Sequence, residues 1–416
     1  MDSKGVGRQQ MIDILSPRQN KFGFYQVGAL QTYSKARAVE YHNKTKEKIH
    51  WHFNDENYKI YDWTQEPTES LSELYRQRAQ QLRDQYDYLV LWFSGGADST
   101  NILNTFIDNN IKLDEVASYV NYEATGDKLN PFNAEIFHVA DPVVNVAKQK
   151  QPWLKHTVID VAPLVMKYFT DPSVKFDWTY FVNTHVNPNT VSRRDIKLQV
   201  PHWTKMFDTG KKVGFINGID KPKVTGLNQK YYYQFYEVID GAVTPEMQML
   251  NRSWDFNELF YWPEDHPKIA IKQGHVIKNF LKTCQRSSPF FTDNKLFAGT
   301  VSVANASDDT YSDIKSLVSD IPKDRKKIHY LTLPGLHTLI YPKWQPVLYQ
   351  VKPQSLTFSF RDTWFFNQSN NESTKYAWQT GLNHRWNSTP DGLRNDWQNM
   401  HAGFKYLLGP TYSLGT

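Results

Sequence analysis

The sequence predicts an α/β protein built on a doubly wound parallel sheet, and three observations support this prediction. Between residues 88 and 220, short apolar runs alternate with amphipathic segments of helical period, the pattern of strands joined by crossover helices. The first run is continuously apolar, as expected of a strand buried on both faces. A glycine turn follows that run directly, at the end of a strand where doubly wound proteins bind their ligands.

Three regions are expected along the 416 residues, since this length favours two to three domains. Residues 1–66 form a small N-terminal extension with two short strands and a polar helix over 32–45. Residues 67–240 form the α/β domain. Residues 241–416 form a mixed α+β region, expected to be a substrate or accessory domain.

The α/β region begins with an amphipathic helix that opens at Pro67. Its apolar residues recur at steps of three and four: Leu71, Leu74, Tyr75, Ala79, Leu82 and Tyr86. The helix leads straight into an apolar strand over 88–93. After the glycine turn, apolar residues at positions 102, 103, 106 and 107 predict a second amphipathic helix.

The remaining elements are assigned by the same periodicities. They are expected in this order: a strand that ends at Tyr122, a helix over 132–149, a strand over 156–161, a helix over 190–209, a strand over 212–218, a strand over 231–238 and a helix over 267–282.

The glycine turn holds the main candidate site. It comprises seven small or polar residues: Ser94, Gly95, Gly96, Ala97, Asp98, Ser99 and Thr100. Two glycines let the backbone bend sharply and approach a ligand closely. The N–H groups at the start of the following helix, with the helix dipole, favour an anion. The hydroxyls add donors, and the carboxylate is suited to hold Mg²⁺ beside phosphates.

This string resembles the SGGxDS loop of the PP-loop ATP pyrophosphatases, the N-type or adenine nucleotide alpha hydrolase-like superfamily. The match covers every defined position of that loop. A Walker loop does not fit, because no Gly-Lys-Ser/Thr follows the glycines. An ordinary turn between strand and helix is the alternative. More broadly, residues 50–280 resemble uncharacterised bacteriophage PP-loop proteins often labelled asparagine synthase-like or phosphoadenylylsulfate reductase-like.

A second candidate segment follows the strand over 212–218, so the fold would bring it beside the glycine turn. Gly218 permits close approach of the backbone, and Asp220 is a weaker candidate for sharing the Mg²⁺. Lys221 would neutralise phosphate charge. With Asp98, these two charged residues are the candidate catalytic groups. A solvated turn is the alternative, because Asp-Lys-Pro suits a turn.

Further candidates lie at two other places. Arg193 sits on a predicted helix and would reach a phosphate, although a solvated helix face explains it equally well. Asn121 and Tyr122 end the second strand, a position that the resemblance places beside the adenine and ribose. Packing is the competing explanation for both. A polar and aromatic cluster over 261–275 is a candidate pocket for a second substrate.

Composition limits the partners. Lys and Arg number 48 against 43 Asp and Glu, a formal charge of +5, which suits a polyanion such as ATP or a nucleic acid. The single cysteine, Cys284, excludes an intramolecular disulfide and a cysteine-based zinc site. No apolar run approaches the roughly 20 residues of a membrane helix. We therefore expect a cytoplasmic protein without a membrane partner, in the host cytoplasm if phage-encoded.

The resemblance implies that ATP, with Mg²⁺ as cofactor, is cleaved between its α and β phosphates. An oxygen of a small-molecule or nucleobase acceptor attacks the α-phosphorus, pyrophosphate leaves, and an amine or ammonia then displaces AMP. Asp2 stands where fused glutaminases carry a catalytic cysteine, which favours free ammonia or an amine. Two alternatives remain: a PP-loop enzyme that modifies a nucleic-acid base, and a nucleotide-binding sensor without turnover.

Overall fold

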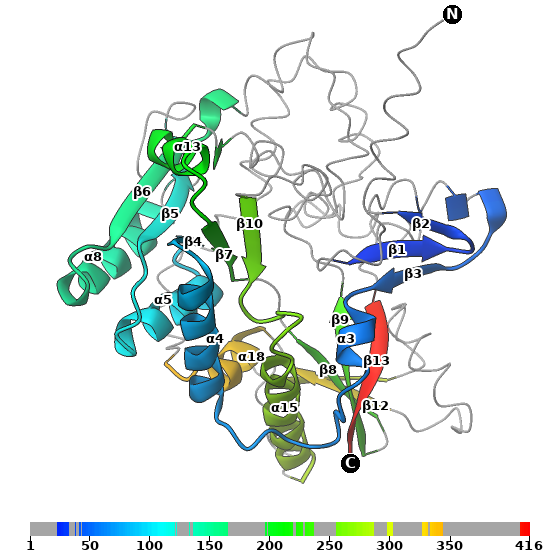
Figure 1. Ribbon diagram of the computed structural model, residues 1–416. Coiled ribbons are helices and arrows are strands. Elements are labelled where there is room, and N and C mark those ends of the chain that lie inside the picture. Colours follow the sequence, from blue (N-terminus) through cyan, green and yellow to red (C-terminus); the bar gives the residue numbers. More distant parts are fainter. Residues whose placement is uncertain are drawn as a thin grey trace, which may run out of the picture.

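In the computed structural model, the described residues form one three-stranded sheet and two five-stranded sheets (Figure 1). The structure describes residues 23–32, 38, 41–42, 44–120, 122, 133, 136–164, 196–197, 199–218, 222–227, 229–236, 255–286, 298–302, 327–331, 333–343 and 408–416.

One five-stranded sheet is parallel throughout and contains the strand before the glycine turn. Its strands are β4 (Tyr88–Trp92), β5 (Glu115–Val120), β6 (Lys155–Asp160), β7 (Val213–Asn217) and β10 (Asp255–Leu259). They lie side by side in the order β10-β7-β4-β5-β6. Along the chain, this sheet therefore begins with the central strand β4 and continues through β5 to β6 at one edge. It is then completed on the other side of β4 by β7 and β10. The sequence prediction of an α/β protein with a parallel sheet is confirmed.

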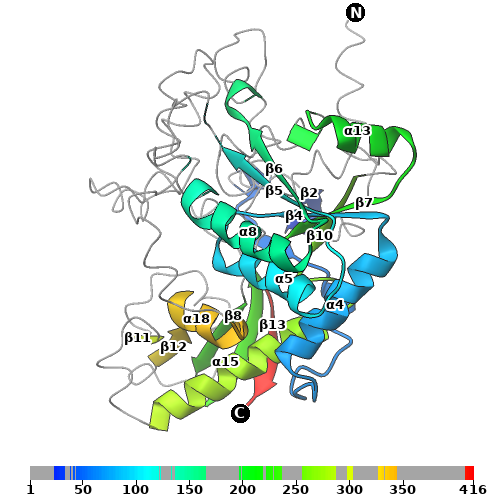
Figure 2. The same cartoon turned by 90° about the vertical axis from the view of Figure 1, so that its left-hand side faces the viewer.

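Helices cover both faces of this sheet (Figure 2). They are α4 (Leu71–Gln85), α5 (Ala97–Asp108) and α8 (Asp141–Lys150) on one face, and α13 (Pro201–Asp208) on the other. The side chains of β4 alternate accordingly. Leu89 and Leu91 join the core beneath α4 and α5, whereas Trp92 meets Trp203 of α13 edge-on, with ring centroids 5.8 Å apart.

The other five-stranded sheet is antiparallel. Its strands are β8 (Lys223–Leu227), β9 (Lys230–Tyr236), β11 (Ala298–Ser302), β12 (Lys327–Leu331) and β13 (Leu408–Gly415). The long helix α15 (Lys268–Arg286) packs against β8, and α18 (Leu333–Ile340) packs against α15. Both five-stranded sheets draw strands from either side of residue 240, where the sequence suggested a boundary.

The N-terminal extension forms the small antiparallel sheet. Its strands are β1 (Phe24–Val27), β2 (Leu30–Thr32) and β3 (Ile49–His52), followed by the short α3 (Asp55–Tyr58). The two strands expected here are present. The helix expected over 32–45 starts too early, because Thr32 pairs with Tyr25 in the sheet.

Helix α4 begins at Leu71 rather than at Pro67. The Ser70 side chain accepts a 3.2 Å hydrogen bond from the Glu73 backbone N–H, and the Glu73 carboxylate accepts a 2.7 Å bond from the Ser70 N–H. This reciprocal pair is a capping box, which satisfies two otherwise unpaired donors and fixes the start of the helix.

Two other predicted helices are shorter or interrupted. Within the helix expected over 132–149, a π-helical turn, η2 (Ile136–Ala140), precedes α8, which has a proline in its first turn. Helix α13 also starts on a proline, Pro201, whereas positions 190–195 of the expected helix lie outside the described residues. Proline lacks an N–H donor, so it favours the first turn of a new helix over the interior of a longer one.

Over the part of the chain that the structure describes, no helix combines the length and the apolar character needed to cross a membrane.

Candidate functional site

Gly95 gives the turn between β4 and α5 its shape. Its φ angle is +77°, a left-handed conformation that side chains with a Cβ rarely adopt. A Cβ at this position would also lie 3.0 Å from the backbone nitrogen of Ala140 and 3.0 Å from Cγ1 of Val139. The π-helical turn η2 therefore packs directly on Gly95, and no larger residue fits there without displacement of one of them.

Gly96 is the residue that caps α5, and it does so without a side chain. Its carbonyl oxygen accepts the first helical bond, 3.0 Å from the nitrogen of Thr100. A Cβ built on Gly96 would meet only Ser94 Oγ within 4 Å, at 3.3 Å. Helix α5 thus begins without a side-chain cap, and the N-terminus of such a helix favours anions.

The three hydroxyls of the turn have different surroundings. Ser94 is exposed, and its Oγ accepts a 3.3 Å hydrogen bond from the Gly96 N–H. Ser99 is buried and donates to the Gly96 carbonyl at 3.3 Å, so it holds the turn together. The Oγ1 atom of Thr100 is buried and has no hydrogen-bond partner among the described residues.

Two tyrosines that lie far from the turn in the sequence donate hydrogen bonds to Asp98, and no sequence pattern predicts these contacts. The hydroxyl of Tyr341, just beyond α18, donates to the Asp98 carboxylate. The hydroxyl of Tyr261, just beyond β10, donates a 2.8 Å bond to the Asp98 carbonyl oxygen. Tyr261 in turn accepts a 3.0 Å bond from the amide of Asn101. Asp98 thus joins three separate segments of the chain, one through its carboxylate and another through its main-chain carbonyl.

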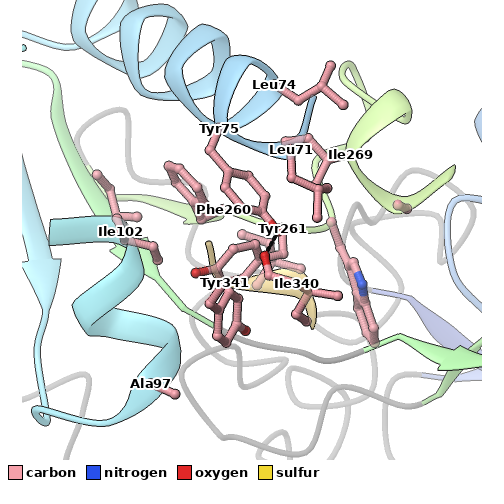
Figure 3. Packing of buried hydrophobic residues seen from close by; sticks show 14 of the residues in the cluster. Leu71, Leu74, Tyr75, Ala97, Ile102, Phe260, Tyr261, Ile269, Ile340 and Tyr341 are labelled. Atoms are coloured by element: carbon pink, nitrogen blue, oxygen red, sulfur yellow. Dashed lines mark hydrogen bonds between the residues drawn. The ribbon is translucent and has the colours of Figure 1, made fainter. Parts of the chain in front are cut away.

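These tyrosines belong to a buried aromatic group (Figure 3). The side chains of Tyr75, Tyr261 and Tyr341 converge between α4, α5 and α18, with ring centroids 5.5 Å apart for the first pair and 5.3 Å for the second. Burial, followed by the charge of Asp98, raises the pKa of Tyr341 well above its ordinary value. Burial likewise raises the pKa of Tyr261 well above its ordinary value. Both hydroxyls therefore stay protonated and act as donors.

Gly218 lies against the first turn of α5. A Cβ on Gly218 would be 3.2 Å from the backbone nitrogen of Ser99 and 3.2 Å from Cδ1 of Ile102. The end of β7 and the glycine turn are thus neighbours, as the position at the reversal of strand order requires. Because Gly218 faces the helix backbone, close packing accounts for the glycine, and its role in ligand binding stays a prediction.

Of the other residues that the sequence predicts to contact a ligand, the structure describes Tyr122. Asn121, Arg193, Asp220 and Lys221 lie outside the described residues. Tyr122 is described and is 41% exposed. Its ring meets Phe137 of η2 edge-on, with centroids 6.5 Å apart, and η2 is the element that packs on Gly95.

A buried chain of polar side chains lies beneath the turn, and no local sequence pattern indicates it. Ser118 Oγ on β5 donates to the carbonyl oxygen of Phe93 at 2.6 Å and lies 3.1 Å from His156 Nε2. The other ring nitrogen of His156 is 3.4 Å from the carboxylate of Asp141, at the start of α8. Ser118 is 1% exposed, so this Ser-His-Asp set supports the turn and offers no nucleophile to a substrate.

The polar and aromatic cluster expected over 261–275 divides in two. Tyr261 reaches the site through Asp98. His275 Nε2 instead bonds the carbonyl oxygen of Trp63 at 2.9 Å, and Lys272 pairs with Glu66 at 2.7 Å. These two side chains attach α15 to the segment that precedes α4.

The residues present fit a phosphate group with an accompanying magnesium ion. Thr100 Oγ1, which has no partner among the described residues, and the N-terminus of α5 without a side-chain cap suit phosphate oxygens. Among the described residues, no group of three or more His, Cys, Asp or Glu could hold a metal by itself. Mg²⁺ is commonly bound through one or two carboxylates plus substrate phosphates, and Asp98 can supply one such carboxylate.

Comparisons of this chain with protein-family models, with curated proteins and with solved structures found no match.

Proposed function

We propose that this chain is an ATP-dependent, AMP-forming enzyme of the PP-loop type, with a doubly wound fold of the adenine nucleotide alpha hydrolase-like class. One observation carries the proposal. A left-handed glycine turn opens into a helix N-terminus without a side-chain cap, between the two strands where the winding of the parallel sheet reverses. Ligands of open α/β sheets bind at such a place, and this terminus favours phosphates.

In this proposal the turn holds pyrophosphate and the α-phosphorus faces the acceptor. An acceptor oxygen forms a bond to the α-phosphorus as the bond to the pyrophosphate oxygen breaks. Pyrophosphate leaves with the electron pair of that bond. An amine or ammonia then attacks the activated carbon of the acceptor, and AMP leaves. Magnesium, when bound, would neutralise phosphate charge, with Asp98 as the protein ligand.

The protein's own contribution is positioning and charge complementarity, which are the main sources of catalysis when no side-chain nucleophile takes part. Backbone N–H groups at the start of α5 stabilise the departing pyrophosphate. Gly95 lets η2 close over one side of the turn. The buried hydroxyl of Ser118 fixes the last residue before the turn from below.

The proposal is tested by determining which phosphate bond of ATP breaks. ATP labelled in its α-phosphate is incubated with the protein, Mg²⁺ and a metabolite extract, and products are separated by chromatography and mass spectrometry. We expect unlabelled pyrophosphate, in an amount equal to the label found in AMP and in adenylated acceptor together, and a newly aminated acceptor. Asp98→Ala should abolish AMP release while the protein stays folded.

Asp84→Ala is the matched control, because Asp84 is an exposed carboxylate on α4 that accepts a 2.7 Å hydrogen bond from Gln80 of the same helix. It should retain AMP formation. Labelled ADP in place of AMP would contradict the proposal. ATP binding without any AMP over hours would replace the enzyme with a nucleotide sensor.

A further inference from the structure

Tyr341 reaches the glycine turn from the part of the chain that forms the antiparallel sheet. We call this sheet, with α15 and α18, the antiparallel lobe. Tyr341 follows α18, which comes directly after β12 of the antiparallel sheet. Its side chain is 1% exposed, and its hydroxyl donates to Oδ1 of Asp98 across a separation of 243 residues. A residue from the antiparallel lobe therefore completes the surroundings of the one carboxylate in the turn.

The position of Tyr341 is set by contacts other than the one to Asp98. Its backbone nitrogen donates to the carbonyl oxygen of His337 at 3.0 Å. The preceding carbonyl, of Ile340, accepts a 2.8 Å bond from Tyr75 on α4. Two residues later, Lys343 pairs with Asp108 at the far end of α5. The hydroxyl is thus presented to the carboxylate by an anchored segment.

A neutral donor in this place has a defined effect on a carboxylate. A hydrogen bond to an ionised oxygen is short and directional, so it fixes the orientation of the group while leaving its charge intact. Asp98 is half-buried and lies in the first turn of α5. In the proposed function, the N-terminus of this helix binds the phosphate. A small displacement of such a carboxylate from its binding position strongly reduces its contribution to ligand binding.

We propose that Tyr341 is a positioning residue that orients the Asp98 carboxylate toward a metal–nucleotide complex, so that the antiparallel lobe completes the ATP site of the parallel sheet. This inference rests on the proposed function. It adds that metal-dependent nucleotide binding requires the contact between α18 and α5.

The experiment measures binding, not turnover. Isothermal titration gives the affinity of the full chain for ATP with Mn²⁺, and separately for ATP with excess EDTA. Tyr341→Phe keeps the ring that packs on Tyr261 and removes only the hydroxyl. We expect it to weaken Mn·ATP binding by about tenfold, the size of one charge-assisted hydrogen bond, and to leave metal-free ATP binding unchanged.

Tyr86→Phe is the matched control, because Tyr86 is a buried tyrosine whose hydroxyl also donates to a carboxylate, that of Glu258. It should leave Mn·ATP affinity unaltered. In an Asp98→Asn background, Tyr341→Phe should have no further effect. A second variant, Asp98→Glu, keeps the charge but shifts the carboxylate by one methylene, and should weaken Mn·ATP binding to a similar degree even if Tyr341→Phe does not fold.

The outcomes separate the two proposals. If wild type binds Mn·ATP and Asp98→Ala loses it, but Tyr341→Phe and Asp98→Glu match wild type, the positioning role is wrong and the proposed function stands. Tighter Mn·ATP binding by Tyr341→Phe would mean that the tyrosine competes with the metal, which also overturns the inference. Absence of ATP binding by wild type would overturn both.

Discussion

The hydroxyl of Ser118 donates a 2.6 Å hydrogen bond to the carbonyl oxygen of Phe93, the last residue before the glycine turn. This bond complements the ladder, in which the Phe93 N–H donates to the Ala117 carbonyl at 2.8 Å. The strand end is therefore held by both a main-chain and a side-chain bond from β5. This support stabilises a turn whose two glycines contribute no side chains to packing.

Ser118→Ala should lower the free energy of unfolding by about 1–3 kcal/mol, since it leaves a buried carbonyl and the buried His156 nitrogen with fewer partners. Urea denaturation followed by circular dichroism measures the change. Thr105→Val is a suitable comparison, because Thr105 donates only to the carbonyl of Asn101 within α5. An equal loss in both variants would show that Ser118 has no special role.

Gly95→Ala should displace the turn, because it combines a left-handed φ with a 3.0 Å approach to the backbone of Ala140. Gly210 offers a matched control: its φ is +73°, yet a Cβ there would meet no atom within 4 Å. Gly210→Ala should cost about 1 kcal/mol from conformation alone. We expect Gly95→Ala to cost clearly more in a denaturant titration and to abolish ATP binding. Equal costs would contradict the close packing of η2.

The local part of the site could be predicted from the sequence, because local pattern determines it. The apolar run, the two glycines and the spacing of Ile102 and Phe106 predict a strand, a tight turn and a helix without any tertiary information. The strand-end rule also predicted that Gly218 would lie beside the turn. In each case the signal lies within a few residues, or follows from the winding of parallel strands.

The contacts across the site could not be predicted in the same way. Tyr261 and Tyr341 meet Asp98 across 163 and 243 residues, and no spacing rule links positions so far apart. A tyrosine in the sequence predicts core packing. It does not indicate which polar group its hydroxyl will bond. The π-helical turn on Gly95 was missed for a related reason, since its apolar residues fit an α-helix equally well.

Stability should fall as the pH is lowered from about 7 to about 5, because burial disfavours the protonated form of three histidines in the described part of the chain. Burial lowers the pKa of His156, His266 and His275. The unfolded chain, whose histidines have a pKa of about 6.5, then binds more protons than the folded chain below that pH. Each His→Gln variant should show a smaller pH slope in the free energy of unfolding, measured by urea titration. An unchanged slope in all three would contradict this assignment.

The ion pair between Arg78 and Glu258 should behave differently from the exposed pairs. The two side chains are 1% and 10% exposed, and their charged atoms are 2.8 Å apart. Arg78→Ala leaves the Glu258 carboxylate nearly buried and without its cation, which should cost about 3–5 kcal/mol in a urea titration. Lys268→Ala removes the partner of Glu69, where the lysine is 52% exposed, and should cost under about 1 kcal/mol. Because the penalty comes from an uncompensated charge, Arg78→Met combined with Glu258→Gln should recover much of the loss. A double variant no more stable than Arg78→Ala would show that the loss does not come from the uncompensated charge of Glu258.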